Sequence, residues 1–203
     1  MDIVNILITL AILLFSVIVH EVMHGLVAEK LGDDTARDAG RITLNPIPHI
    51  DPFGSILLPA ILLFVGSPII LGAAKPVPVN FENLRPRKFG MALVSIAGPG
   101  SNFILAILLA LPITFGLITG VMRDIWMQAV IMNLVLGTFN LLPIPPLDGS
   151  KILASMLPDR IMYRILDMER FGFLLVLAFL LFGVLDKILL PVIIVFLRIF
   201  NLS

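Results

Sequence analysis

The sequence predicts an all-α membrane protein: polytopic transmembrane helices, a small membrane-associated extended or β segment, and a re-entrant hairpin between the first two core helices. Hydrophobic residues make up 59% of the chain and charged residues 14%, whereas soluble domains have roughly 45–50% and about 25%. Five apolar runs reach or approach the roughly 20 residues that a helix needs to cross hydrocarbon. They lie near residues 3–19, 53–72, 91–119, 126–147 and 171–200.

The first helix is predicted at residues 3–31, and Gly32 is a natural stop. This segment begins with Asp2 in place of a basic region and has no small-residue cleavage pattern. We therefore expect a retained helix and not a signal peptide, so that the mature chain begins at Met1.

The segment after the first helix is rich in proline. Residues 42–44 alternate in polarity and predict a short extended strand, and the prolines of residues 45–52 exclude a helix there. Residues 53–72 are apolar but broken by proline and glycine, which favours a hairpin that re-enters the membrane and is covered by protein. Residues 75–79, Lys-Pro-Val-Pro-Val, are expected to be extended.

The rest of the chain predicts two further core helices, a connector and a hydrophobic tail. The helices are expected at residues 91–119 and 126–147, and residues 152–170 form a basic amphipathic connector. Residues 171–200 are interrupted by glycine and by an Asp-Lys pair. This pattern predicts either a tight hairpin or one kinked helix.

Length and composition limit the organisation and the chemistry. With 203 residues the chain is about one domain long, and we expect a core at residues 1–155 followed by the connector and C-terminal transmembrane segment or segments at 156–203. The net charge of zero gives no indication of nucleic-acid binding. The absence of cysteine excludes disulfides and thiolate ligands, which leaves imidazole, carboxylate and amide groups for any metal site.

A candidate metal site lies near the end of the first helix. His20 and His24 are four residues apart, about 40° from each other around a helix, so both imidazoles can bind one ion. Glu21 lies on the flank of this pair. A His-Glu-x-x-His pattern arises by chance in soluble sequences, but ionisable groups within a transmembrane helix are costly to bury and are usually functional.

Two histidines leave a catalytic zinc site one protein ligand short. The candidates in apolar surroundings are His49, Asp51 and Asp148. We select Asp148, because the adjacent prolines and Gly149 would end the preceding helix and turn the carboxylate inwards. His49 and Asp51 fit better in a turn whose side chains bind the local backbone.

Four motifs resemble one family. His20-Glu21-Val22-Met23-His24 together with residues 140–149, Asn-Leu-Leu-Pro-Ile-Pro-Pro-Leu-Asp-Gly, resembles the site-2 protease family of intramembrane zinc metalloproteases. Residues 97–102, Ala-Gly-Pro-Gly-Ser-Asn, look like the motif at the start of that family's middle core helix. The Lys-Pro-Val-Pro-Val segment resembles a compact subgroup without PDZ or CBS domains. The resemblance covers about residues 15–155.

The resemblance implies roles for individual residues. His20, His24 and Asp148 would ligate one zinc ion per chain, and Glu21 would be the general base. Asn102 and Asn140 would contact the substrate or stabilise the oxyanion; the alternative is that each amide only bonds a neighbouring helix.

The position of the ligands constrains the topology. His24 and Asp148 each follow an apolar run of about 20 residues, so the helices preceding them must run in the same direction for the ligands to meet. The basic residues then gather on one side, which the positive-inside rule assigns to the cytoplasm. Those residues are Lys30, Arg37, Arg41, Lys75, Arg85, Arg87, Lys88, Lys151, Arg160, Arg164 and Arg170, and the core loops leave Arg123 on the other side.

The expected reaction is hydrolysis of a peptide bond within the transmembrane segment of a membrane protein, near the cytoplasmic face. Glu21 would accept the proton of the attacking water and deliver it to the departing amine. Because a helical peptide bond is shielded, the substrate must unwind; residues 41–45 could pair with it as an added strand, and residues 75–79 would form a rigid border. The expected partners are such substrates and the lipid bilayer, and the oligomeric state is not indicated.

Two alternative functions are a metal transporter and a catalytically inactive relative. A metal transporter would distribute acidic and histidine residues over the depth of several helices, but here they gather at one end. A catalytically inactive relative that acts as a scaffold is the second alternative.

Overall fold

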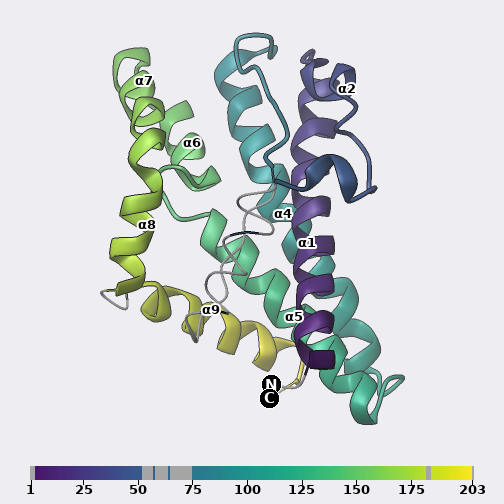
Figure 1. Ribbon diagram of the computed structural model, residues 1–203. Helices are drawn as coiled ribbons and strands as arrows, with labels where there is room; N and C mark the ends of the chain where they lie inside the picture. Colours follow the sequence, from purple (N-terminus) through teal and green to yellow (C-terminus); the bar gives the residue numbers. More distant parts are fainter. Residues whose placement is uncertain (1–2, 52–56, 58–63, 65–74, 182–183, 203) are drawn as a thin grey trace.

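The computed structural model describes residues 3–51, 57, 64, 75–181 and 184–202, and every regular element within them is helical. Three long helices form the body of the molecule (Figure 1): α1 (Ile3–Lys30), α4 (Arg87–Thr114) and α5 (Gly120–Asn140). The shorter elements are α2 (Thr35–Asp38), η1 (Ile47–His49), α6 (Asp148–Ser155), α7 (Asp159–Asp167), η3 (Met168–Phe171), α8 (Gly172–Leu181) and α9 (Val184–Ile199). The predicted all-α class is confirmed.

Two of the described helices, α1 and α4, are long and apolar enough to cross a membrane. Each has 28 residues, about 42 Å at 1.5 Å per residue, and a bilayer core is about 30 Å thick. The buried share of the most apolar 18-residue window is 17% in α1 and 39% in α4. A core helix of a soluble protein would be mostly buried, so this outward apolar surface fits a lipid environment.

The directions of the long helices agree with the predicted topology. Gln128 of α5 donates to the Thr9 hydroxyl of α1 at 2.6 Å, and Asn133, further along α5, donates to the Ser16 hydroxyl at 3.0 Å. The paired positions increase together, so α1 and α5 run in the same direction, as expected. The Arg85 amide donates to the Leu31 carbonyl at 2.9 Å, so the chain leaves α1 and enters α4 at one end of the molecule.

The prediction of a strand at residues 42–44 is wrong. In the described part of the chain these residues form bends, and no strand is present beside them. The Thr43 hydroxyl accepts the Asn45 amide at 3.1 Å, and the Thr43 carbonyl accepts a bond from the His49 ring at 2.8 Å. These local bonds turn the segment back on itself. The predicted re-entrant hairpin at 53–72 lies outside the described residues, except for residues 57 and 64.

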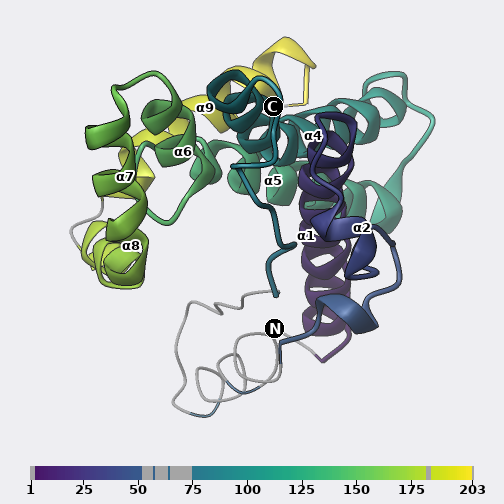
Figure 2. The same ribbon diagram turned by 90° about the horizontal axis from the view of Figure 1, so that it is seen from above.

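The helices divide into two groups on either side of α4 and α5. Figure 2 shows α1 and α2 on one side and α6, α7 and α8 on the other. A buried apolar cluster joins the groups at the α1 C-terminal end: Ala28, Leu84, Met91, Val94, Ala154 and Met162. Because Met162 lies on α7, the basic connector packs directly against the core that holds α1 and α4.

Among the described residues the hydrophobic tail is closer to the predicted kinked helix than to a tight hairpin. It consists of α8 and α9, and α9 turns away from α8 towards α5 (Figure 1). Phe196 and Leu197 of α9 pack against the buried cluster that contains Val130 and Leu134 of α5. The Thr114 hydroxyl donates to the Phe200 carbonyl at 2.9 Å and links this end to α4.

Candidate metal centre

Three buried side chains from two distant parts of the chain meet between α1 and α6. His20 and His24 are one turn apart on α1, and Asp148 is the first residue of α6. The His20 Nε2 atom lies 3.1 Å from His24 Nε2 and 3.1 Å from Asp148 Oδ2. The distance from His24 Nε2 to Asp148 Oδ2 is 3.2 Å. Within the described residues these three form the group that could hold a metal ion.

The hydrogen bonds around the cluster leave three acceptor atoms facing one another. His24 Nδ1 lies 2.7 Å from the Val94 carbonyl, which can only accept, so the proton is on Nδ1. His20 Nδ1 lies 2.7 Å from the Asn102 Oδ1 atom, which is likewise an acceptor. In neutral imidazoles, both Nε2 atoms therefore direct a lone pair towards the carboxylate oxygen. Burying three acceptors together is unfavourable unless a cation lies between them.

The donor set and its spacing fit zinc. Tetrahedral zinc ligands at about 2.0–2.1 Å from the ion lie roughly 3.3–3.4 Å from one another, close to the observed 3.1 and 3.2 Å. In both histidines the second ring nitrogen donates to a protein oxygen, which is the usual arrangement behind a metal-bound imidazole. Three protein ligands leave one coordination position for water or substrate.

Gly98 of α4 keeps the space in front of the imidazoles open. A Cβ atom at this position would lie 2.6 Å from His20 Nε2 and 2.6 Å from His24 Cε1, closer than real Cβ contacts. Any side chain at residue 98 would therefore clash with both imidazoles. This role was not predicted from the sequence, because it depends on how closely α4 approaches α1.

Asn102 lies behind His20 and is fully buried. Its Oδ1 atom accepts the His20 bond, and its Nδ2 atom donates to Asn133 Oδ1 at 2.9 Å and to the Ser16 carbonyl at 3.3 Å. Both ends of the amide are thus used inside the protein. This geometry favours orientation of the His20 ring over the expected contact with substrate.

The remaining candidates lie outside the cluster. Asn140 donates to the Leu136 carbonyl of its own helix at 3.0 Å. His49 is fully buried and bonds the Thr43 carbonyl, as expected for a turn. Neither His49 nor Asp51 belongs to the metal-ligand group found in the described part of the chain.

Glu21 lies beside the cluster and points to another segment. Its Oε2 atom accepts a hydrogen bond from the Val77 amide at 2.7 Å. Val77 was not among the predicted site residues, although the alternating prolines of the Lys-Pro-Val-Pro-Val motif are visible in the sequence. The motif itself is visible in the sequence, but nothing in it indicates a contact with Glu21, which lies 56 residues away.

Charged groups near the site are paired. Lys151 Nζ lies 3.8 Å from Asp148 Oδ1 and 3.9 Å from Glu169 Oε1, so it adds a positive charge behind the aspartate.

At the end of α1, burial acts to raise the pKa of Asp33, but hydrogen bonds from Thr35, Asn83 and Asn80 outweigh it and lower that pKa. Asp33 is therefore held as a carboxylate.

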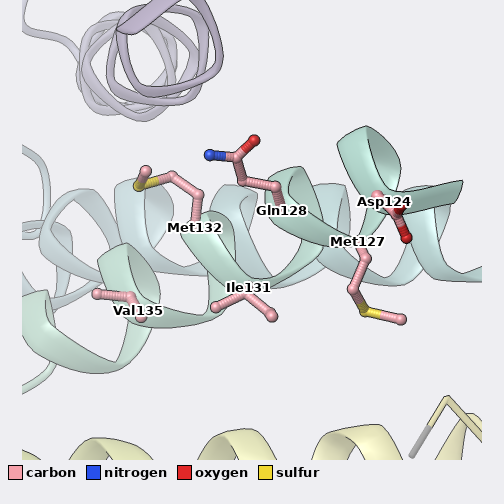
Figure 3. A pocket seen from close by; sticks show the side chains of 6 residues that line it. All are labelled: Asp124, Met127, Gln128, Ile131, Met132 and Val135. Carbon is pink, nitrogen blue, oxygen red and sulfur yellow. The ribbon is translucent and has the colours of Figure 1, made fainter. Parts of the chain in front are cut away.

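A separate hollow of about 480 Å³ lies along α5 (Figure 3). None of its lining residues belongs to the metal cluster. They are Asp124, Met127, Gln128, Ile131, Met132 and Val135. The hollow is mainly apolar, and the candidate chemistry lies beyond the other end of this helix.

The fold and the site define a class: a His-Glu-x-x-His helix with a distant aspartate, embedded in apolar helices, is a metalloprotease-type zinc site. Comparison with known proteins agrees. Residues 116–183 match the family described as Peptidase family M50. The "Putative zinc metalloprotease YwhC" of Bacillus subtilis is 43% identical over 178 residues, which are 82% of this chain and 76% of that protein.

Further relatives from mycobacteria carry the name "Putative zinc metalloprotease Rip2". The Mycolicibacterium smegmatis protein is 29% identical over 177 residues, 86% of this chain and 66% of its own length. The Mycobacterium tuberculosis protein is 33% identical over 169 residues, 81% of this chain and 63% of its own length. No solved structure gives a significant match. The chain belongs to Peptidase family M50, the site-2 protease family of zinc metalloproteases, which favours an enzyme over a metal transporter.

Proposed function

We propose that the protein is an intramembrane zinc endopeptidase that cleaves transmembrane segments of membrane proteins near the cytoplasmic face. The observation that carries this proposal is the convergence of three buried acceptor atoms at 3.1–3.2 Å beside Glu21. The helix that bears two of them, α1, exposes most of its apolar surface. A hydrolytic centre on such a helix has access to peptide bonds that water-soluble proteases do not reach.

His20, His24 and Asp148 would hold one zinc ion per chain. The chemistry that a bound ion supplies is polarisation of a carbonyl group and acidification of water. The protein contributes fixed ligand positions: Asn102 and the Val94 carbonyl hold the two imidazoles with their Nε2 atoms directed inwards. Gly98 keeps the approach open.

Glu21 would act as the general base and then as the general acid. Its carboxylate takes one proton from water as the water oxygen bonds to the scissile carbonyl carbon. It then delivers that proton to the nitrogen as the carbon–nitrogen bond breaks, so the products are a carboxylic acid, which keeps the second water proton, and an amine. The second Glu21 oxygen, Oε1, is the one left for this transfer, because Oε2 accepts the Val77 bond.

The distribution of charge supports a cytoplasmic site. Lys30 ends α1 and Arg87 begins α4, and the bond between Leu31 and Arg85 brings these two ends together. Arg123 lies near the start of α5, at the opposite end of that helix from the Asp148 segment. By the positive-inside rule, the basic end that carries the cluster faces the cytoplasm.

Substrates of this enzyme would be membrane-spanning segments that unwind readily. A peptide bond inside a helix is shielded by its own turn, so glycine or other helix-weakening residues near the cut would favour cleavage. The apolar hollow along α5 has a lining compatible with such a segment (Figure 3). Residues 42–44 form bends, so residues 41–45 do not offer a preformed strand for pairing with the substrate.

The test is cleavage of a single-span reporter protein in liposomes by the purified enzyme. Glu21→Gln should keep one zinc per chain, measured by inductively coupled plasma mass spectrometry, and lose cleavage by about 10²–10⁴-fold. Undiminished cleavage by this variant would refute the proposed mechanism.

A further inference from the structure

Residues 75–80 form a strap that lies against α1 beside Glu21. They have no regular secondary structure. Pro76 and Pro78 have no amide hydrogen, and Val77 between them does. That single N–H group donates to Glu21 Oε2 at 2.7 Å. The strap therefore presents one donor to the carboxylate, flanked by two residues that cannot compete for it.

The Val77 side chain holds the strap close to the helix. It is buried, with 7% of its surface exposed. A Cβ atom on Gly25 would lie 3.2 Å from Val77 Cγ1, so the glycine permits this approach. Gly25 follows Glu21 by four residues and lies on the same face of α1. The strap thus crosses α1 over the Glu21 face.

Both ends of the strap are anchored to buried groups. At Lys75, the amide donates to the His49 carbonyl at 2.9 Å, and the carbonyl accepts the buried Arg41 guanidinium at 2.6 Å. At Asn80, the amide donates to Asp33 Oδ2 at 2.7 Å, and Asp33 is fully buried. The backbone at Val77 is fixed from both sides.

We propose that the Val77 backbone N–H is a positioning group for the general base: the strap fixes Glu21 Oε2 so that Oε1 faces the metal centre. The inference rests on the proposed function of Glu21. A glutamate side chain has three rotatable bonds, and free rotation would spread its carboxylate over several rotamers. One strong bond to a charged acceptor selects a single rotamer before substrate arrives.

The direct test removes the donor and keeps the chain. Val77→Pro lacks the N–H group, and Val77→Ala keeps it, so Val77→Ala is the matched control for lost side-chain packing. We expect Val77→Pro to lower kcat by about 10-fold or more, with KM and zinc per chain unchanged. Val77→Ala keeps the N–H group and the anchors at Lys75 and Asn80, so its kcat should fall by clearly less than that of Val77→Pro. A purely structural role would lower the folded yield of both variants without separating kcat from KM.

A second variant keeps the test decisive if three consecutive prolines disturb folding. Replacing Val77 by its α-hydroxy acid turns the donating amide into an ester and preserves the side chain. The same fall in kcat is expected. A kcat equal to or above that of Val77→Ala, in the ester or the proline variant, would overturn the inference. Glu21→Gln in the same assay separates the claims: if it is inactive while the ester variant is fully active, the strap inference fails and the general-base role stands.

Discussion

Both halves of α4, residues 87–102 and residues 103–114, contribute buried residues, but the two halves differ in chemistry. Its first half contributes Gly98 and Asn102 to the metal centre, where a buried amide links His20 to neighbouring helices. Its second half contributes Ala106, Ala110 and Ile113 to an apolar cluster with α5 and α9. Polar groups are retained in the first half although burial is costly. The first half of α4 is therefore built for binding and the second half for packing.

The largest effect is expected from Gly98→Ala in the binding half. The added Cβ would lie too close to the His20 and His24 Nε2 atoms, so zinc affinity should fall by at least about 100-fold, and cleavage with it. Gly100→Ala is the matched control, because a Cβ there meets nothing within 4 Å. Zinc titration with a competing chelator measures both. Equal zinc affinities for the two variants would contradict the geometry.

Asn102→Ala should come next. Loss of the His20 Nδ1 partner frees the ring and leaves a buried donor unpaired, which typically costs 10-fold to about 100-fold in metal affinity. Asn140→Ala serves as the comparison, because that side chain bonds only its own helix among the contacts described. The same chelator titration applies. If Asn140→Ala weakened zinc more than Asn102→Ala, the assignment of roles would be reversed.

Leu134→Ala probes the packing half. Leu134 is fully buried in the cluster with Ala106 and Ala110, so truncation should lower the free energy of unfolding by about 2–5 kcal/mol. Zinc per folded chain should not change. Thermal unfolding in detergent micelles together with metal analysis checks both statements. Loss of zinc from the folded variant would show that the two halves are not separable.

The smallest effect concerns Asp33 at the end of α1. Its pKa is lowered in the folded protein, where Thr35, Asn83 and Asn80 donate to it. Its stabilising contribution is therefore present above the unfolded pKa of about 3.9 and is lost as pH falls through the folded pKa. Asp33→Asn should unfold at a lower temperature than the wild type at pH 7, and the difference should shrink below about pH 4. A difference that is constant with pH would contradict this.

Local patterns in the sequence predicted much of the fold and the three side chains that meet in the candidate metal centre. The four-residue spacing of His20 and His24 is decided within one turn of α1, and apolar runs decide where long helices form. The prediction of a strand at residues 42–44 is wrong because no partner strand lies beside it in the described part of the chain, and Thr43 bonds locally instead. Alternation alone does not form a sheet.

The parts that the sequence did not predict depend on contacts between distant residues. Asn102 contacts a histidine 82 residues away, and Val77 contacts a glutamate 56 residues away. The composition of either segment does not indicate which atom its polar group will meet. The space that Gly98 keeps open is likewise a property of two packed helices.

The most direct test of the account is X-ray absorption at the zinc edge on the purified protein, read beside metal analysis of single-ligand variants. We predict one zinc per chain with nitrogen and oxygen ligands at about 2.0–2.2 Å, including two imidazoles. His20→Ala, His24→Ala and Asp148→Ala should each lose the bound metal. Stoichiometric zinc with an unchanged absorption spectrum in all three variants would place the metal elsewhere and contradict the central claim.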